Sequence, residues 1–317
     1  MKNKKKYRDL CKHEETIPIF SQAWWLDSVC GDSWDVCLVE KNNQIIAAMP
    51  YAIEKKLGFN LIVQPRLTQS LGPWFRVNEK NERKKLSQQK KLMFDLIEQL
   101  PSYSYFQQSW SVDQDNWLPF YWKGFSQTTK YTYIINLEKS LDEILKGFSS
   151  SYRNKIRKAE KIVEIKSGLS PDKFYEINKK TFNRQGINIP YSYSFFKKHD
   201  ESIKRMKGGK VFYAEDLNGN IHSALYLTWD RRSAFVHLVG EDSNYRNSGA
   251  GILLIWEAIK YSKNYLKLTS FDFEGSMIES VERVRRDCGG VQHPYFSITK
   301  HQSKLLKILM FLRLVKI

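Results

Sequence analysis

The chain has 317 residues, of which 42% are hydrophobic and 14% aromatic, so it can bury a core and is neither disordered nor fibrous. Its formal net charge of +17 favours anionic partners such as nucleic acid, phosphorylated small molecules or an acidic membrane face. A basic, soluble surface accounts for this charge equally well, so charge alone does not select a function.

The first half of the chain is predicted to begin with a helix and to continue with strands. Apolar residues at helical spacing predict a helix over residues 20–29. Residues 36–40 and 44–53 form a predicted hairpin around the turn Lys41-Asn42-Asn43. A strand over 59–63, a helix over 84–100 and strands over 103–107 and 129–137 follow.

The second half contains helices, then three closely spaced strands, then alternating elements. The predicted helices are 140–161, 172–184, 193–207, 250–262 and 277–287, and the predicted strands are 210–216, 221–229, 233–239, 266–273 and 293–299. This order predicts a mixed sheet with helices packed on it, of the α/β or α+β class. We expect two tandem domains, residues 1–136 and 137–317, which share a broad interface.

The four cysteines, Cys11, Cys30, Cys37 and Cys288, show no C-x-x-C spacing and no association with histidine. We therefore expect reduced thiols, no metal site and a cytoplasmic protein. The basic N-terminus is not followed by the apolar region of a secretory signal, and no apolar run is long enough to span a membrane.

A glycine-containing loop between a strand and a helix is the most informative segment. Arg246, Gly249 and Gly251 spell R-x-x-G-x-G, with Asn247, Ser248 and Ala250 between them. Glycines let the backbone approach a ligand closely, and the unpaired first amides of a helix favour an anion. The segment therefore predicts a diphosphate site, although many glycine-rich helix starts merely turn the chain.

This loop resembles motif A of the GNAT superfamily, which holds the pyrophosphate of acetyl-CoA. Residues 148–161 (FSSSYRNKIRKAEK), 271–277 (FDFEGSM) and 278–290 (IESVERVRRDCGG) are similar to segments of Fem-type and related double-GNAT acyltransferases. The resemblance implies two tandem GNAT-like domains, the first of them degenerate, with acetyl-CoA or another acyl-CoA as co-substrate. It also implies roles in cell-surface polysaccharide or cell-wall biosynthesis. Fem-type ligases instead transfer amino acids from aminoacyl-tRNA to peptidoglycan precursors.

One feature departs from the GNAT pattern. GNAT enzymes usually carry a tyrosine in the helix after the late strand, as proton donor to the leaving thiolate. No tyrosine lies between Met277 and Gly290. Either another residue protonates the thiolate, or CoA is not the donor. A third interpretation is that the protein no longer catalyses a reaction and is a binding protein of the same fold.

Acylation of an amine requires removal of its proton and a donor for the oxyanion. The resemblance implies that a backbone amide within residues 238–240 supplies the oxyanion contact. The candidate bases are Glu241, after the strand, and Asp272 and Glu274, which should share one face of the next strand. For Glu241 an exposed loop acid is the preferred explanation, and salt bridges with arginines of the segment 283–286 explain Asp272 and Glu274 equally well. His237, in mid-strand, is more often a core histidine than a base.

Basic residues mark a candidate acceptor site in the cleft between the domains. Arg153 and Arg157 are four residues apart on one helix, so both face one way, and arginine suits bidentate contact with phosphate. Arg184 is a further candidate. An anionic, amine-bearing acceptor such as a nucleotide-linked sugar or a lipid diphosphate fits these residues, and a solvated basic face explains them equally well.

The C-terminal segment, residues 305–317, is apolar apart from three cations. It is too short to span a bilayer. It can lie in a membrane interface near a lipid-linked substrate. We slightly prefer a helix that docks on the protein or on a second subunit.

Overall fold

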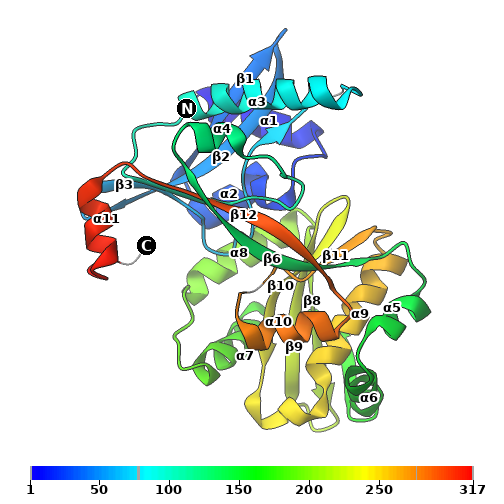
Figure 1. Ribbon diagram of the computed structural model, residues 1–317. Helices are drawn as coiled ribbons and strands as arrows, with labels where there is room; N and C mark the ends of the chain where they lie inside the picture. The colour runs from blue at the N-terminus through cyan, green and yellow to red at the C-terminus, as the bar shows by residue number, and fades with distance from the viewer. Residues whose placement is uncertain (1, 77–78, 276, 316–317) are drawn as a thin grey trace. The chain divides into compact units, whose positions relative to one another are not determined.

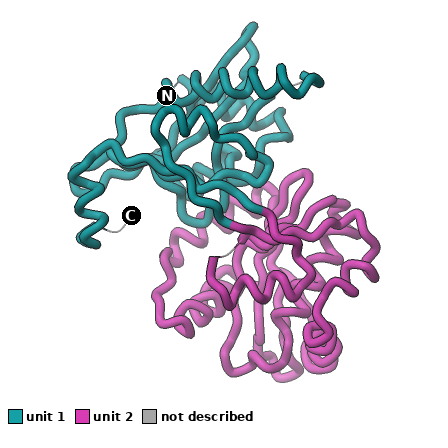
Figure 2. Tube along the Cα trace, in the orientation of Figure 1, with its two compact units in different colours: residues 1–130, 294–317 teal, residues 131–293 magenta. Residues whose placement is uncertain are grey.

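A computed structural model describes residues 2–76, 79–275 and 277–315 of the chain. Ser276, in the segment 271–277, and the last two residues of the segment 305–317 lie outside the described residues. The chain divides into two compact units, residues 1–130 with 294–317 and residues 131–293 (Figure 2). The first boundary is near the expected one at 136, but residues 294–317 group with the first unit.

The first unit contains a predominantly antiparallel sheet with helices. Its helices are α1 (Lys2–His13), η1 (Ile19–Ser21), α2 (Ala23–Cys30), α3 (Glu82–Glu98), α4 (Leu118–Trp122) and α11 (Lys304–Phe311). Its strands are β1 (Trp34–Lys41), β2 (Gln44–Lys56), β3 (Phe59–Val63), β4 (Trp74–Phe75) and β5 (Tyr105–Ser109). The predicted hairpin is β1–β2, and its turn places Asn42 and Asn43 at positive φ, which asparagine tolerates.

The C-terminal segment belongs to the first unit because of one long strand. β12 (Val291–His301) begins in the second unit and pairs with β5 from Ser297 to His301. α11 follows, and its Leu306 is buried with Leu61 and Tyr105 of β3 and β5. Figure 1 shows this red helix beside β3. The preferred expectation, a C-terminal helix docked on the protein, agrees with these contacts.

The second unit is built on strands in the order β6-β11-β10-β9-β8-β7 (Figure 1). Its strands are β6 (Ser126–Asn136, which begins in the first unit), β7 (Val163–Ser167), β8 (Gly209–Asp216), β9 (Ile221–Trp229), β10 (Ser233–Glu241) and β11 (Ser270–Asp272). Its helices are α5 (Leu141–Gly147), α6 (Ser150–Ala159), α7 (Pro171–Arg184), α8 (Tyr193–Arg205), η2 (Ser243–Ser248), α9 (Ala250–Asn264) and α10 (Glu279–Asp287).

The sheet of the second unit is mixed, as expected. β7, β8, β9 and β10 pair antiparallel, β11 pairs parallel with β10, and β6 pairs antiparallel with β11. The apolar face of α9, including Leu254, Ala258 and Ile259, is fully buried in the core of this unit. α9 therefore holds the loop that precedes it against the sheet.

One predicted helix, residues 140–161, is two helices. α5 ends at Gly147, and the Ser149 hydroxyl accepts a hydrogen bond from the Tyr152 amide and so begins α6. The Arg153 guanidinium donates to the carbonyls of Lys146 and Phe148, at the end of α5. A capping serine and a carbonyl-binding arginine thus break the helix. No helix of the described residues is long and apolar enough to cross a membrane.

Candidate active site

Strand β11 pairs with only the first third of β10. The pairing with β11 extends from Ser233 to Phe235, whereas the pairing with β9 continues to Glu241. A bulge between Val236 and Leu238 puts His237 out of register with β9. β11 ends at Asp272, opposite Phe235, so it leaves the rest of β10 unpaired on this side. The backbone of residues 236–241 therefore has an edge that β11 does not cover.

Helix α7 lies against this part of β10 and binds its backbone. Asn178 Nδ2 donates to the Val239 carbonyl at 2.7 Å, and the Tyr191 hydroxyl donates to Asn178 Oδ1 at 2.5 Å. The Thr181 hydroxyl accepts from the Glu241 amide at 2.8 Å. A Cβ at Gly240 would lie 2.7 Å from the backbone nitrogen of Asn178, so only glycine lets α7 pack this closely on β10.

These contacts show which way the peptide groups of β10 point. In an antiparallel pair, the N–H and C=O of one residue point to the same side of the strand. The Val239 carbonyl is bound by Asn178 on α7, so it points away from β9, and the Val239 N–H faces the same edge. Of the three amides within residues 238–240, the Val239 amide is therefore the one that points to the edge of β10 that β11 leaves unpaired.

The loop after β10 leads directly into the N-terminus of α9. The Asp242 side chain accepts from the Asn244 amide and caps η2, and the Ser248 hydroxyl accepts from the Ala250 amide. Gly249 has a left-handed conformation, φ 83°, as the N-cap of α9. Arg246 is largely exposed and its Nε lies 3.8 Å from Glu241 Oε2. The loop thus combines a helix N-terminus with an exposed guanidinium, which suits an anion.

Helix α6 packs directly on this loop. A Cβ at Gly249 would lie 2.7 Å from the Lys155 carbonyl oxygen, so α6 backbone occupies one side of the glycine. Lys158 Nζ donates to the Asn247 carbonyl at 2.9 Å. Gly249 is therefore required by its conformation and by helix packing, whether or not a ligand binds. The same packing brings two lysines of α6 to the rim of the loop.

The acid predicted after β10 forms ion pairs. Glu241 Oε2 lies 2.6 Å from Arg184 Nη1 and 3.8 Å from Arg246 Nε. Its neighbour Asp242 pairs with Lys180 at 2.5 Å. Glu241 is thus held between one arginine from the predicted acceptor set and one from the loop. Its role as a base stays a prediction.

Asp272, the last residue of β11, is a buried carboxyl with a strongly altered pKa. Burial raises its pKa to about 7, and hydrogen bonds from the Thr132 hydroxyl and the Glu274 amide oppose this rise. The nearby charge of Arg285 also favours the ionised form. A carboxyl with a pKa near 7 can exchange a proton at neutral pH, as a general base must.

Glu274 does not share a strand face with Asp272 in the way alternation predicts. β11 ends at Asp272, and Glu274 has a positive φ of 58°, so it lies outside the strand. Its Oε1 lies 3.1 Å from His237 Nδ1. Burial raises the pKa of Glu274, and the proximity of His237 lowers it. Glu274 therefore faces the bulge of β10.

His237 links Glu274 to a second buried histidine. His237 Nε2 lies 3.3 Å from His199 Nε2 of α8, and burial holds the pKa of His199 well below its ordinary value. Which nitrogen donates in each of these contacts depends on the tautomers of the two rings. His237 is thus a buried, hydrogen-bonded histidine, in agreement with its more common role.

The three predicted acceptor arginines have different surroundings. Arg153 binds carbonyl groups at the end of α5, Arg184 pairs with Glu241, and Arg157 is exposed. The structure brings Arg184, Glu241 and Arg246 together but places Arg153 in a capping role. The assignment of these residues to an acceptor stays a prediction.

Sequence reasoning did not select the polar residues of α7. Asn178 and Thr181 interrupt the apolar stripe of Phe174 and Ile177 at helical spacing. A buried asparagine in an apolar stripe requires partners, and that signal was available in the sequence. Its partner Tyr191 follows α7 in a loop and carries no such signal.

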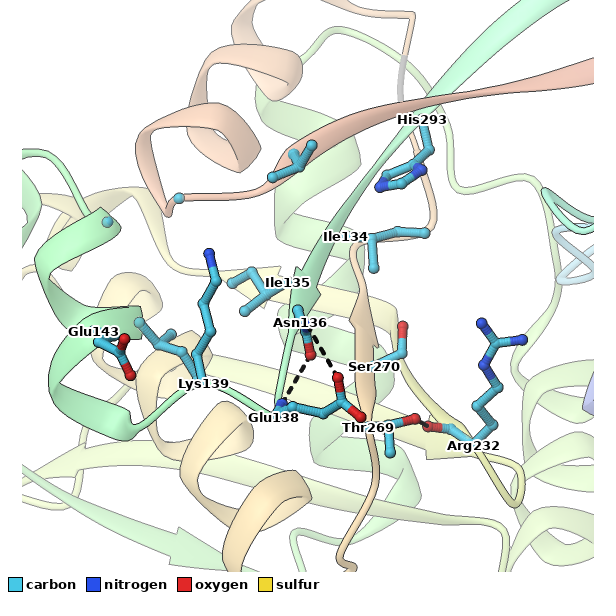
Figure 3. A pocket seen from close by; sticks show the side chains of 14 residues that line it. Ile134, Ile135, Asn136, Glu138, Lys139, Glu143, Arg232, Thr269, Ser270 and His293 are labelled. Atoms are coloured by element: carbon cyan, nitrogen blue, oxygen red, sulfur yellow. Dashed lines mark hydrogen bonds between the residues drawn. The ribbon is translucent and has the colours of Figure 1, made fainter.

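A separate cavity of about 450 Å³ lies where β10 and β11 begin (Figure 3). Lys139, Arg232 and His293 line it together with Glu138 and Glu143. Figure 3 shows Lys139 and Arg232 on opposite sides, with Asn136 and Glu138 hydrogen-bonded between them. No predicted site residue lines this cavity, and its mixed charges do not indicate one class of ligand.

Comparisons with known proteins identify the fold of the second unit and of the chain. Residues 146–278 match the acetyltransferase (GNAT) domain family. No curated protein sequence matches the chain. The crystal structure of FemX aligns with a TM-score of 0.70 at 12% identity, over 97% of this chain and 98% of FemX.

Two further solved structures have the same fold. A tandem GNAT protein from the clavulanic acid biosynthesis pathway aligns with a TM-score of 0.52 at 10% identity, over 95% of each chain. The structure of L-PGS from Bacillus licheniformis aligns with a TM-score of 0.57 at 8% identity, over 98% of this chain and 95% of that protein. Residues 146–278 thus match a GNAT domain family, and the chain shares its fold with FemX and with a tandem GNAT protein, as the sequence resemblance predicted.

Proposed function

We propose that this protein is an N-acyltransferase that moves an acyl group from acyl-CoA to an amine on an anionic acceptor. The reaction belongs, in this proposal, to cell-surface polysaccharide or cell-wall biosynthesis in the cytoplasm. One observation carries the proposal. The part of β10 that β11 leaves unpaired leads into a loop that carries Arg246 and ends at the N-terminus of α9, inside a segment that matches the GNAT acetyltransferases.

The unpaired edge of β10, along residues 236–241, suits an acyl group held against the strand. The amine nitrogen attacks the thioester carbon, a C–N bond forms, and the carbonyl oxygen becomes an oxyanion. The Val239 amide, which points to this unpaired edge, is our candidate donor to that oxyanion. Collapse of the intermediate breaks the C–S bond and releases the CoA thiolate. Fixed amides at such a position are typically worth about a hundred- to a thousand-fold in rate.

The proton of the amine needs an acceptor in this mechanism. Asp272 is our first candidate, because its pKa of about 7 leaves it partly ionised at neutral pH. Glu274 and Glu241 are the alternatives. Glu274 is bound to His237, and Glu241 is bound to Arg184, so each needs its partner to shift before it accepts a proton.

The diphosphate of the donor is assigned to the loop of Arg246 to Gly251. Arg246 supplies an exposed positive charge, and the positive end of the α9 helix dipole also favours an anion. Lys155 and Lys158 of α6 add positive charge at the rim. For the acceptor we retain Arg184 and Arg157, with Arg153 as the least accessible of the three.

A second candidate is transfer from aminoacyl-tRNA, and two observations favour it. The backbone of α6 lies against Gly249, so less space remains beside the loop for a diphosphate. No tyrosine occurs between Met277 and Gly290 to protonate a thiolate, so the proton donor that is usual in CoA-dependent GNAT enzymes is missing from this segment. The net charge of +17 also suits RNA.

One experiment separates these donors. The full chain is incubated with labelled acetyl-CoA or with a mixture of aminoacyl-tRNAs, together with a panel of amine-bearing nucleotide sugars and peptidoglycan precursors. Transfer from acetyl-CoA supports the first proposal, and transfer from aminoacyl-tRNA alone replaces it with the second. Loss of transfer in Asp272→Asn and retention in Asp142→Asn, an exposed acid of α5, would connect the activity to this site. No transfer from either donor would leave a binding protein of the same fold.

A further inference from the structure

Helix α11 buries one face and exposes another. Leu306 is buried against Leu61 and Tyr105, and Leu309 and Met310 pack on the same cluster. Five apolar residues on the outer side have exposed fractions between 55% and 85%. They are Leu305, Ile308, Phe311, Leu312 and Leu314. Single exposed apolar residues are ordinary on protein surfaces, but five within ten positions form a continuous patch.

The charged side chains within this C-terminal segment all have one sign. Lys304 and Lys307 are exposed on α11, two turns and one turn before Phe311, and the exposed Arg313 follows the helix. The sequence from Lys300 to Ile317 contains no aspartate or glutamate. An apolar face bordered only by cations is complementary to an anionic lipid surface, where apolar side chains enter the acyl boundary and cations meet the headgroups.

We propose that α11 and the segment to Leu314 bind the surface of an anionic membrane. The helix has eight residues, from Lys304 to Phe311, so it lies along the surface and does not cross it. Leu306 already holds the helix on β3 and β5, so its outer face is presented without unfolding. Such binding would place the protein at the membrane whatever donor or acceptor its reaction uses.

The test is co-sedimentation of the full chain with vesicles. The probe is phosphatidylglycerol mixed with phosphatidylcholine, and phosphatidylcholine alone is the neutral comparison. We expect binding to the anionic vesicles that weakens as salt rises. The triple variant Leu305→Ser, Ile308→Ser, Phe311→Ser should bind at least about ten-fold more weakly, because each side chain loses burial in lipid. Its substitutions are at exposed positions, so the fold should persist.

Matched variants distinguish the patch from general surface properties. Leu217→Ser with Tyr265→Ser removes exposed apolar residues elsewhere and should leave vesicle binding unchanged. Lys304→Gln with Lys307→Gln should weaken binding by about five-fold per charge. Lys84→Gln with Lys91→Gln, on α3, should have a much smaller effect. Equal binding by wild type and the triple variant would overturn the proposal, as would equal binding to neutral vesicles. A dimer that dissociates in the triple variant, without vesicle binding, would identify the patch as an interface between copies.

Discussion

Replacement of Asp272 by asparagine should change both the pH dependence of stability and the rate of transfer. The asparagine Oδ1 can still accept from the Thr132 hydroxyl and the Glu274 amide, which both bind Oδ1 in the wild type. The substitution therefore removes the ionisable group while it preserves size and hydrogen bonds. This makes the variant a test of the carboxyl and not of the packing.

The direction of the stability effect follows from the raised pKa. Burial raises the pKa of Asp272 to about 7, so the folded state binds its proton more tightly than the unfolded state. Stability from this group is fully present below about pH 4 and is lost as pH rises through 7. Complete ionisation costs up to about 4 kcal/mol, from 1.36 kcal/mol for each pH unit of the rise.

Urea unfolding at a series of pH values between 4.5 and 8 measures this effect. The free energy of unfolding of the variant should exceed that of the wild type increasingly as pH rises, by up to about 4 kcal/mol at pH 8. Asp172→Asn is the control, because hydrogen bonding to Ser170 lowers the pKa of this exposed acid, so its stabilising effect is lost only below about pH 4 and the variant should differ from the wild type by a constant amount between pH 4.5 and 8. A difference between wild type and Asp272→Asn that does not vary with pH would refute the reasoning. If Asp272 is the base, turnover should also fall about a hundred-fold or more while donor affinity stays unchanged.

Three further predictions concern β10 and its neighbours. Gly240→Ala should destabilise the fold by about 1–3 kcal/mol in urea unfolding, because its Cβ meets the backbone of α7 at 2.7 Å; an unchanged midpoint would contradict this contact. Asn178→Ala should lower kcat with little change in donor affinity, since the Val239 carbonyl loses the group that positions it. Equal losses of kcat and donor affinity would indicate that Asn178 maintains the shape of the donor site. Arg157→Gln should raise KM for an anionic acceptor in steady-state kinetics, and an unchanged KM would identify Arg157 as part of a solvated basic face.

Much of the second unit could be predicted from the sequence because its signals are local. Three strands alternate with turn residues, and the apolar run of α9 follows the R-x-x-G-x-G loop, so periodicity and turn chemistry agree. The predicted strand over 266–273 is shorter, Ser270–Asp272, because the amides of Leu266 and Leu268 bind carbonyls at the end of α9. Lys267 adopts a positive φ in that connection, which no local pattern indicates.

The site was predictable in its loop and less so in its side chains. The position of Gly249 at the start of α9 follows from the motif, but the packing of α6 against it depends on a contact nearly a hundred residues away. Asp272 and Glu274 were selected by strand alternation, which fails because the strand ends at Asp272. Arg153 was selected by its spacing from Arg157, but it binds carbonyls of the preceding helix. The packing of α6 against Gly249 is a tertiary contact, whereas the end of β11 and the capping contacts of Arg153 are local features that spacing alone does not indicate.

The most direct test of the proposed function is calorimetric titration of the full chain with acetyl-CoA, compared with Arg246→Gln. Arg246 is exposed, and Glu241 keeps its closer partner Arg184 when Arg246 is replaced, so the fold should be unaffected. Loss of one charged contact to phosphate should weaken binding about ten- to a hundred-fold. Arg205→Gln, an exposed arginine at the end of α8, should bind like the wild type. Acetyl-CoA binding that is equal in Arg246→Gln and the wild type, or that is absent in the wild type, would contradict the assignment of an acyl-CoA site to this loop.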